Sequence, residues 1–135
     1  IQESDKKYLK ALTHLNPTHE YGVAFERGTR LQLPSSLLYY ISGTASIDNK
    51  GEVVYLGDIK KQTGRLLENI GALLADGGAT MHDIKYFIIY LRDFSDYDTV
   101  SRMMAQIYPD IPCAIVHAPV CRPQWLVEME CVAEK

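Results

Sequence analysis

The sequence has no long hydrophobic run and little cysteine, and each shortage excludes a class of protein. Its apolar runs, such as Tyr86 to Leu91, are far shorter than the roughly 20 residues that a membrane-spanning helix needs. The cysteines, Cys113, Cys121 and Cys131, are odd in number and lie in apolar stretches, which argues against a secreted disulfide framework. We therefore expect a soluble cytoplasmic protein with reduced thiols.

Basic residues are too few for a typical nucleic-acid-binding protein. The chain has 14 Lys and Arg residues against 17 Asp and Glu residues, which gives a net charge of -3 and a pI of about 5.8. Proteins that bind nucleic acid usually carry a basic face. We therefore expect neither a nucleic acid nor a membrane as partner.

The length and composition predict one domain. The chain has 135 residues, of which 47% are hydrophobic, and folding at this length removes roughly 68–70% of the unfolded chain's surface from water. We assign residues 23–135 to this domain. Residues 1–22 are expected to be a helical arm or linker, because apolar residues recur at helical spacing over 3–15. This segment is either a linker left from a longer protein, as the start at Ile1 suggests, or an arm packed on a neighbour.

Alternating side chains predict antiparallel strands in the first half of the domain. Over 23–33, apolar residues alternate with charged ones, which is typical of a half-exposed strand. A second strand is predicted over 37–42. The turn residues 48–51 then predict a hairpin that leads into a strand over 52–55.

Two helices are predicted in the second half. Asp58 caps the first, which ends at Gly77, and Ser95 caps the second, which is closed by Pro109. Each has a stripe of apolar residues that we expect to be buried: Leu66, Ile70, Leu73 and Leu74 in the first, and Val100, Met103, Met104 and Ile107 in the second.

Further strands are predicted over 83–93, 113–118 and 125–133. Because each helix connects one strand to the next, right-handed connections place both helices on one face of the sheet. The fold class is therefore α+β. The opposite face would be left bare and partly apolar, so we expect a homo-oligomer whose sheets face inward.

The last strand carries the most informative acidic residues. Alternation puts Glu128 and Glu130 on one face, about 6.6–6.8 Å apart along the strand. They are either part of a solvated face or, in a cleft, a pair in which burial and repulsion raise at least one pKa and so make a general acid. Arg122, just upstream, either holds an anionic substrate through its planar guanidinium or forms a loop salt bridge.

A hydroxyl-rich segment, 42–46, ends one predicted strand. Ser42, Gly43 and Thr44 are candidates for binding a carboxylate through backbone N–H groups and hydroxyls. The alternative is a turn whose hydroxyls bond locally. The spacing matches neither a phosphate-binding loop nor the nucleophile elbow of a serine hydrolase.

Cys113, His117 and Cys121 are spaced by four residues. Along an extended strand this spacing spans about 13 Å, too far for one metal ion. We expect no metal or other cofactor. The cysteines are interpreted as small core residues, with Cys113 as a candidate cleft residue.

Four segments together resemble the YjgF/RidA superfamily, whose members include endoribonuclease L-PSP-like proteins and translation initiation inhibitors. The segments are Ile41–Ser42–Gly43, the asparagine-bearing helix 62–74, the stretch 90–97 and Val127–Glu128–Met129–Glu130. The resemblance covers roughly residues 23 to 133. It implies a chorismate-mutase-like fold, with a single mixed sheet and two helices on one face, that assembles as a homotrimer with ligand clefts between subunits.

The enzymes that this chain resembles hydrolyse reactive enamines or imines, and they hold the substrate carboxylate with an arginine shortly after a proline. Here the corresponding stretch is Pro112–Cys113–Ala114–Ile115, so Ala114 replaces that arginine. Glu128 matches the cleft glutamate of the superfamily, and Ser42 and Gly43 match its substrate contacts at the strand end.

A second branch of the superfamily is similar in more detail. Gly43–Thr44–Ala45–Ser46–Ile47, Val120–Cys121–Arg122–Pro123 and Leu126–Val127–Glu128 resemble the C-terminal half of chorismatases. This resemblance implies that Arg122 binds substrate carboxylates and that Glu128 acts as the acid. Chorismatases contain two related domains in one chain, whereas this chain supplies one.

Two functions follow as expectations. The first is an enzyme acting on a small unsaturated carboxylate, with Arg122 as anion binder and Glu128 as general acid. The second is a non-catalytic module that binds a small anionic metabolite or another chain in the same cleft. A ribonuclease or translation-inhibitor role conflicts with the acidic charge.

Overall fold

The computed structural model describes residues 1–22 and 24–135. Its strands and helices, in chain order, are β1 (Lys6–Leu9), β2 (Gly28–Gln32), β3 (Leu37–Thr44), α1 (Ile59–Asp76), β4 (Ile84–Leu91), α2 (Tyr97–Ile107), β5 (Cys113–His117) and β6 (Val127–Glu134). Four short 3-10 helices are interspersed: η1 (Glu3–Asp5), η2 (Thr18–Tyr21), η3 (Met81–Asp83) and η4 (Phe94–Asp96). In this part of the chain no helix combines the length and apolarity needed to cross a membrane.

The strands form one mixed sheet in the order β1-β2-β3-β6-β4-β5. β4 and β5 are parallel, and every other neighbouring pair is antiparallel. Because β3 and β4 are both antiparallel to β6, they run parallel to each other. The connection from β3 to β4 and the connection from β4 to β5 each join two parallel strands. Each connection contains one helix.

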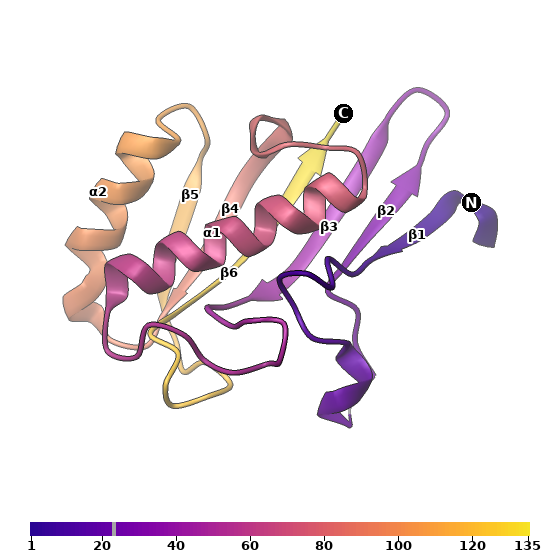
Figure 1. Ribbon diagram of the computed structural model, residues 1–135. Coiled ribbons are helices and arrows are strands. Elements are labelled where there is room, and N and C mark those ends of the chain that lie inside the picture. The colour runs from indigo at the N-terminus through magenta and orange to yellow at the C-terminus, as the bar shows by residue number, and fades with distance from the viewer. Residues whose placement is uncertain (23) are drawn as a thin grey trace.

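Both helices cover the same face of the sheet, as Figure 1 shows. The core lies between them and the inward side chains of the central strands, such as Tyr39, Phe87 and Met129, which are fully buried. On the opposite face Tyr40 and Tyr86 are 47% and 42% exposed. The predicted α+β class, with two helices on one face and the other face bare, is confirmed.

Helix α1 agrees with the sequence in its cap and its buried stripe. The Asp58 side chain accepts a hydrogen bond from the Lys61 N–H at 3.0 Å, which satisfies one of the orphan donors of the first turn. The four apolar residues predicted to be buried are fully buried: Leu66, Ile70, Leu73 and Leu74. Local signals were sufficient here because the cap and the stripe belong to one continuous segment.

Helix α2 departs from the prediction at both ends. Ser95 does not cap it, because it lies inside η4 and donates its own N–H to the Asp93 side chain at 2.9 Å. Val100 and Met104 are buried as expected and Met103 is partly buried, but Ile107 is 49% exposed. The predicted stripe was thus one turn too long.

The helix predicted over 3–15 is absent. Lys6–Leu9 instead pairs with β2 as an edge strand, and Ala11 has a left-handed φ of 47°, which a helix does not tolerate. Leu12 is 53% exposed although its helical neighbours Leu9 and Leu15 are fully buried. The backbone hydrogen bonds to β2 stabilise the strand more than the weak helical propensity of this segment stabilises a helix.

Two predicted strands are shorter than expected. The strand over 23–33 begins only at Gly28 and ends at Gln32, and Val23 lies outside the described residues. The hairpin turn forms, with the Asp48 side chain accepting two backbone N–H bonds. The strand over 52–55, however, reduces to a single bridge between Ile47 and Val53.

Candidate functional site

A cleft of about 540 Å³ opens where β3 ends and the loop before β6 begins. Of the site residues predicted from sequence, it brings together Ser42, Gly43, Arg122 and Glu128. Segments far apart in the chain complete its walls, with Tyr21 from η2 among them.

Glu128 is the acidic group of the cleft. It lies on β6, half-buried, and faces away from the helices as alternation predicts. Burial raises the pKa of its carboxyl, and the nearby Glu130 carboxylate raises it further. A carboxyl with a raised pKa keeps a proton at higher pH and can therefore donate it.

Gly43 makes room for this carboxyl. A Cβ atom placed on Gly43 would lie 2.6 Å from Oε1 of Glu128 and 3.3 Å from its Cδ. The pairing of β3 with β6 shifts register between Ile41 and Thr44, and this irregularity brings Gly43 under the acid. Only glycine allows the carboxyl to rest on the strand at this distance.

Glu130 lies outside the cleft. It lines a shallow hollow on the bare face of the sheet and accepts a hydrogen bond from the Tyr90 hydroxyl at 2.7 Å. The bond to Glu130 is the main cause of the raised pKa of Tyr90. Glu130 thus acts on the cleft through its charge, which raises the pKa of Glu128.

Arg122 is held by a backbone carbonyl and two aromatic rings. Nη1 donates to the Gly51 oxygen at 2.8 Å, and Cζ lies 5.3 Å from the Tyr21 ring centroid and 5.1 Å from that of Trp125. Among the described residues no carboxylate pairs with it, so the loop salt bridge considered from sequence is not found there. The remaining N–H groups suit an anionic ligand.

Arg27 is a second cleft arginine, which sequence reasoning missed. It is 6% exposed, and its guanidinium donates to the backbone oxygen and to Oδ1 of Asn16 at 2.9 Å and 2.8 Å. The sequence does contain a signal for Arg27 as a candidate site residue. Alternation over 23–33 places this charged residue on the same side as Phe25. A charge on an apolar face needs partners or a function.

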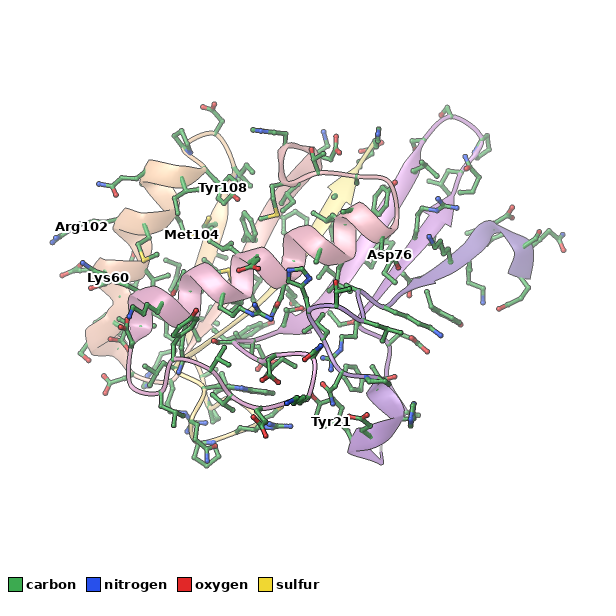
Figure 2. All side chains as sticks on the ribbon, viewed as in Figure 1. Tyr21, Lys60, Asp76, Arg102, Met104 and Tyr108 are labelled. Carbon is green, nitrogen blue, oxygen red and sulfur yellow. The ribbon has the colours of Figure 1, made fainter. Side chains whose placement is uncertain are left out.

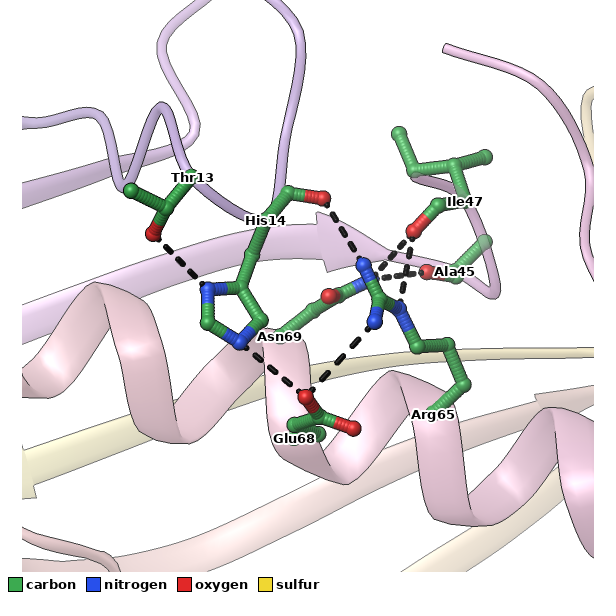
Figure 3. Close-up of polar contacts among 7 residues, drawn as sticks. All are labelled: Thr13, His14, Ala45, Ile47, Arg65, Glu68 and Asn69. Atoms are coloured by element: carbon green, nitrogen blue, oxygen red, sulfur yellow. Dashed lines mark hydrogen bonds and ion pairs between the residues drawn. The ribbon is translucent and has the colours of Figure 1, made fainter. Parts of the chain in front are cut away.

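Side chains of helix α1 hold another wall of the cleft through the polar contacts drawn in Figure 3. The Asn69 amide donates to the carbonyl oxygens of Ala45 and Ile47 at 3.0 Å and 3.1 Å, and Arg65 Nε donates to Ile47 at 3.1 Å. Ala45 and Ile47 both line the cleft. Asn69 is fully buried, so its bonds hold the wall firmly against the helix.

The other predicted site residues lie elsewhere. Thr44 is buried and donates its hydroxyl to the Ser42 carbonyl at 2.9 Å, the local bonding considered as an alternative. Cys113 lines a separate hollow beside α2, where burial raises the pKa of its thiol. Cys121, not Cys113, lines the cleft. Ala114 is exposed on the edge strand β5.

The chain is similar to known proteins in sequence. The family model "Endoribonuclease L-PSP" matches residues 25–135. The 3-aminoacrylate deaminase RutC of Acinetobacter baylyi is 32% identical over 98 residues, which cover 71% of this chain and 78% of that protein. A RutC family protein of Pyrococcus abyssi is 33% identical over 98 residues, 71% of this chain and 77% of that protein.

Solved structures extend the similarity to the whole fold. A chorismatase crystal structure superposes with a TM-score of 0.83 and 26% identity, covering 95% of this chain but 43% of that chain. A Rid-family protein from Yersinia pestis superposes with a TM-score of 0.77 and 23% identity, covering 95% of this chain and 98% of that one.

Proposed function

Because this chain belongs to the YjgF/RidA superfamily of endoribonuclease L-PSP-like proteins, we propose that it hydrolyses a small unsaturated carboxylate. The substrate class is an alkene that carries a carboxylate and an oxygen or nitrogen substituent, that is, an enol ether or an enamine. Glu128 is the general acid and Arg122 binds the carboxylate. Ser42 and Gly43 line the substrate position.

One observation carries this proposal: a glutamate with a raised pKa shares a cleft with an arginine that pairs with no carboxylate of the described chain. The arginine attracts an anion. The acid stays protonated to higher pH than an ordinary glutamate and can supply a proton to the bound molecule.

In the proposed reaction, Glu128 donates its proton to the alkene carbon β to the heteroatom. The heteroatom's lone pair stabilises the resulting oxocarbenium or iminium ion. Water adds to the cationic carbon and returns a proton to Glu128. The carbon–heteroatom bond then breaks as the new hydroxyl proton moves to the leaving group, so that one water is consumed and an oxo acid and an alcohol or ammonia are released.

Two features favour the enol ether over the enamine. Ala114 occupies the position at which the deaminases of the superfamily have an arginine. The structural similarity to chorismatase reaches 26% identity over 95% of this chain. This chain spans less than half of the chorismatase chain. We therefore include in the proposal that this domain has the activity by itself.

The test is the substitution Glu128→Gln with Glu134→Gln as a matched control on the same strand. Glu134 is exposed at the end of β6. With chorismate as substrate and pyruvate as the measured product, Glu128→Gln should lower kcat by about 10²–10⁴-fold and leave ligand binding intact. Glu134→Gln should keep the wild-type rate. Unchanged turnover in Glu128→Gln would exclude the acid role.

A non-catalytic module is the second candidate, and the absence of the deaminase arginine at Ala114 favours it. It predicts saturable binding of a small anionic metabolite, measured by calorimetry, with no conversion of chorismate or of imines. Turnover that depends on Glu128 would exclude this alternative.

A homotrimer with its bare sheet faces inward is the assembly that we propose. The exposed Tyr40 and Tyr86 on that face support it, because such apolar surface favours association. Light scattering should give three times the chain mass of 15.3 kDa. A monomer would contradict the proposed assembly.

A further inference from the structure

We propose that residues 13–22 form a functional wall of the cleft. In this wall Tyr21 is a positioning residue for Arg122. This inference rests on the proposed function of Arg122 as the anion binder. The segment precedes residues 25–135, the part of the chain that the family model matches. The match itself therefore assigns this segment no role.

Tyr21 lies between the two cleft arginines. Its ring centroid is 5.3 Å from Cζ of Arg122 and 5.3 Å from Cζ of Arg27. The Tyr21 hydroxyl accepts from Arg27 Nη2 at 3.2 Å and donates to Asn16 Oδ1 at 2.9 Å. An aromatic ring attracts a guanidinium, so one side chain contacts both arginines of the cleft.

Asn16 contacts two of the groups that hold Arg122, the Tyr21 side chain and Gly51. Through Oδ1 it holds the Tyr21 hydroxyl. Its amide also lies against Gly51, where an added Cβ would be 2.6 Å from Nδ2, and the Gly51 carbonyl accepts the bond from Arg122 Nη1. Asn16 is 3% exposed, so the carbonyl and the ring that position the guanidinium rest on one buried residue.

The segment is anchored to helix α1 just before Asn16. Arg65 Nη2 donates to the carbonyl oxygen of His14 at 3.2 Å, and the His14 Nε2 atom lies 3.0 Å from Glu68 Oε1 (Figure 3). Leu15, the next residue along the chain, is fully buried. Tyr21 then ends η2 beneath the sheet in the view of Figure 2. These contacts make the wall a fixed part of the fold rather than a loose tail.

The orientation of Arg122 matters because its charge is used for binding. Within the described chain neither Arg122 nor Arg27 has a carboxylate partner, so the cleft offers a positive field to an anion. With Nη1 bound to Gly51, the remaining N–H groups of Arg122 are those available to a ligand. Loss of the Tyr21 ring removes one of the three contacts that hold this orientation and leaves those with Gly51 and Trp125.

The experiment is a double-mutant cycle in the Glu128→Gln background, in which a bound substrate is not converted. Calorimetry measures the Kd of chorismate. Tyr21→Leu should raise Kd about tenfold, the size of a partly desolvated cation–π contact. Tyr21→Phe keeps the ring and should change Kd by less than about threefold. The control Tyr8→Leu, on the edge strand β1, should leave Kd unchanged.

The cycle separates positioning from general structural damage. In an Arg122→Ala background Tyr21→Leu should have almost no further effect on Kd, because its action passes through Arg122. An equal effect in both backgrounds, or no effect in either, would overturn the inference. With a converted substrate, Tyr21→Leu should raise KM while kcat changes little, the pattern of lost uniform binding.

A readout without ligand keeps this inference distinct from the proposed function. Trp125 is the single tryptophan of the chain, and Arg122 lies 5.1 Å from its ring. Tyr21→Leu and Arg122→Ala should therefore alter the near-UV circular dichroism of Trp125 in the same way, whereas Tyr8→Leu should not. If chorismate does not bind at all, the proposed function fails, and an unchanged Trp125 signal in Tyr21→Leu would overturn the positioning role separately.

Discussion

The substitution Gly43→Ala tests the position of the acid with a single methyl group. The three atoms nearest to the new Cβ would all belong to Glu128, with Oε1 at 2.6 Å, Cδ at 3.3 Å and Cγ at 3.6 Å. Ordinary van der Waals contact begins near 3.4 Å. The carboxyl must therefore retreat by about 0.8 Å, the difference between 3.4 Å and 2.6 Å.

This displacement should reduce catalysis far more than stability. A misplacement of about 1 Å can lower a rate about 10²-fold, so kcat should fall to about one hundredth of the wild-type value. The clashing group is the end of a flexible side chain, which can rotate away. Alanine also restricts the unfolded chain, an effect worth about 0.4–1 kcal/mol in favour of folding. The free energy of unfolding should therefore change by less than about 1 kcal/mol.

The assay pairs two measurements on the same protein. Pyruvate release from chorismate, coupled to lactate dehydrogenase, gives kcat, and urea unfolding followed by Trp125 fluorescence gives the free energy of unfolding. Gly64→Ala is the matched control, because a Cβ at Gly64 in α1 would meet no atom within 4 Å. It should keep the wild-type kcat and gain about 0.5–1 kcal/mol of stability.

A kcat within about threefold of wild type in Gly43→Ala, with stability preserved, would refute the reasoning, since a displacement near 1 Å should cost far more. It would mean that the carboxyl of Glu128 need not occupy the position above β3. A large loss of stability together with lost activity would also count against the argument, because the clash would then involve the backbone rather than the acid.

Two further predictions follow from the surroundings of the cleft. Glu130→Gln removes a charge that raises the pKa of Glu128, so that pKa should fall and the basic limb of the kcat profile should move to lower pH. An unmoved limb would show that Glu130 does not act on the acid. Asn69→Ala deprives the Ala45 and Ile47 carbonyls of the Asn69 amide donor and should lower the free energy of unfolding by about 1–3 kcal/mol, measured by urea titration. A change below about 0.5 kcal/mol would contradict the role of Asn69 in holding the wall.

Local sequence signals determined the parts of the fold that depend on one continuous segment. Asp58 and the apolar stripe of α1 predicted that helix because a cap and a period of 3.6 act within a few turns. Alternation along β6 placed Glu128 and Glu130 on one face for the same reason. The order of strands and helices, together with the resemblance to a known superfamily, then predicted the α+β class.

The composition of the cleft was decided by tertiary structure. The apolar residues over 3–15 have a helical spacing, but pairing with β2 made Lys6–Leu9 a strand, and no local signal reports a distant hydrogen-bond partner. The register shift between β3 and β6 brought Gly43 under Glu128. The packing of Tyr21 against Arg122 joined residues that are 101 positions apart in the sequence. Contacts of this kind depend on which surfaces the whole chain buries together, and a single sequence encodes them only through the complete fold.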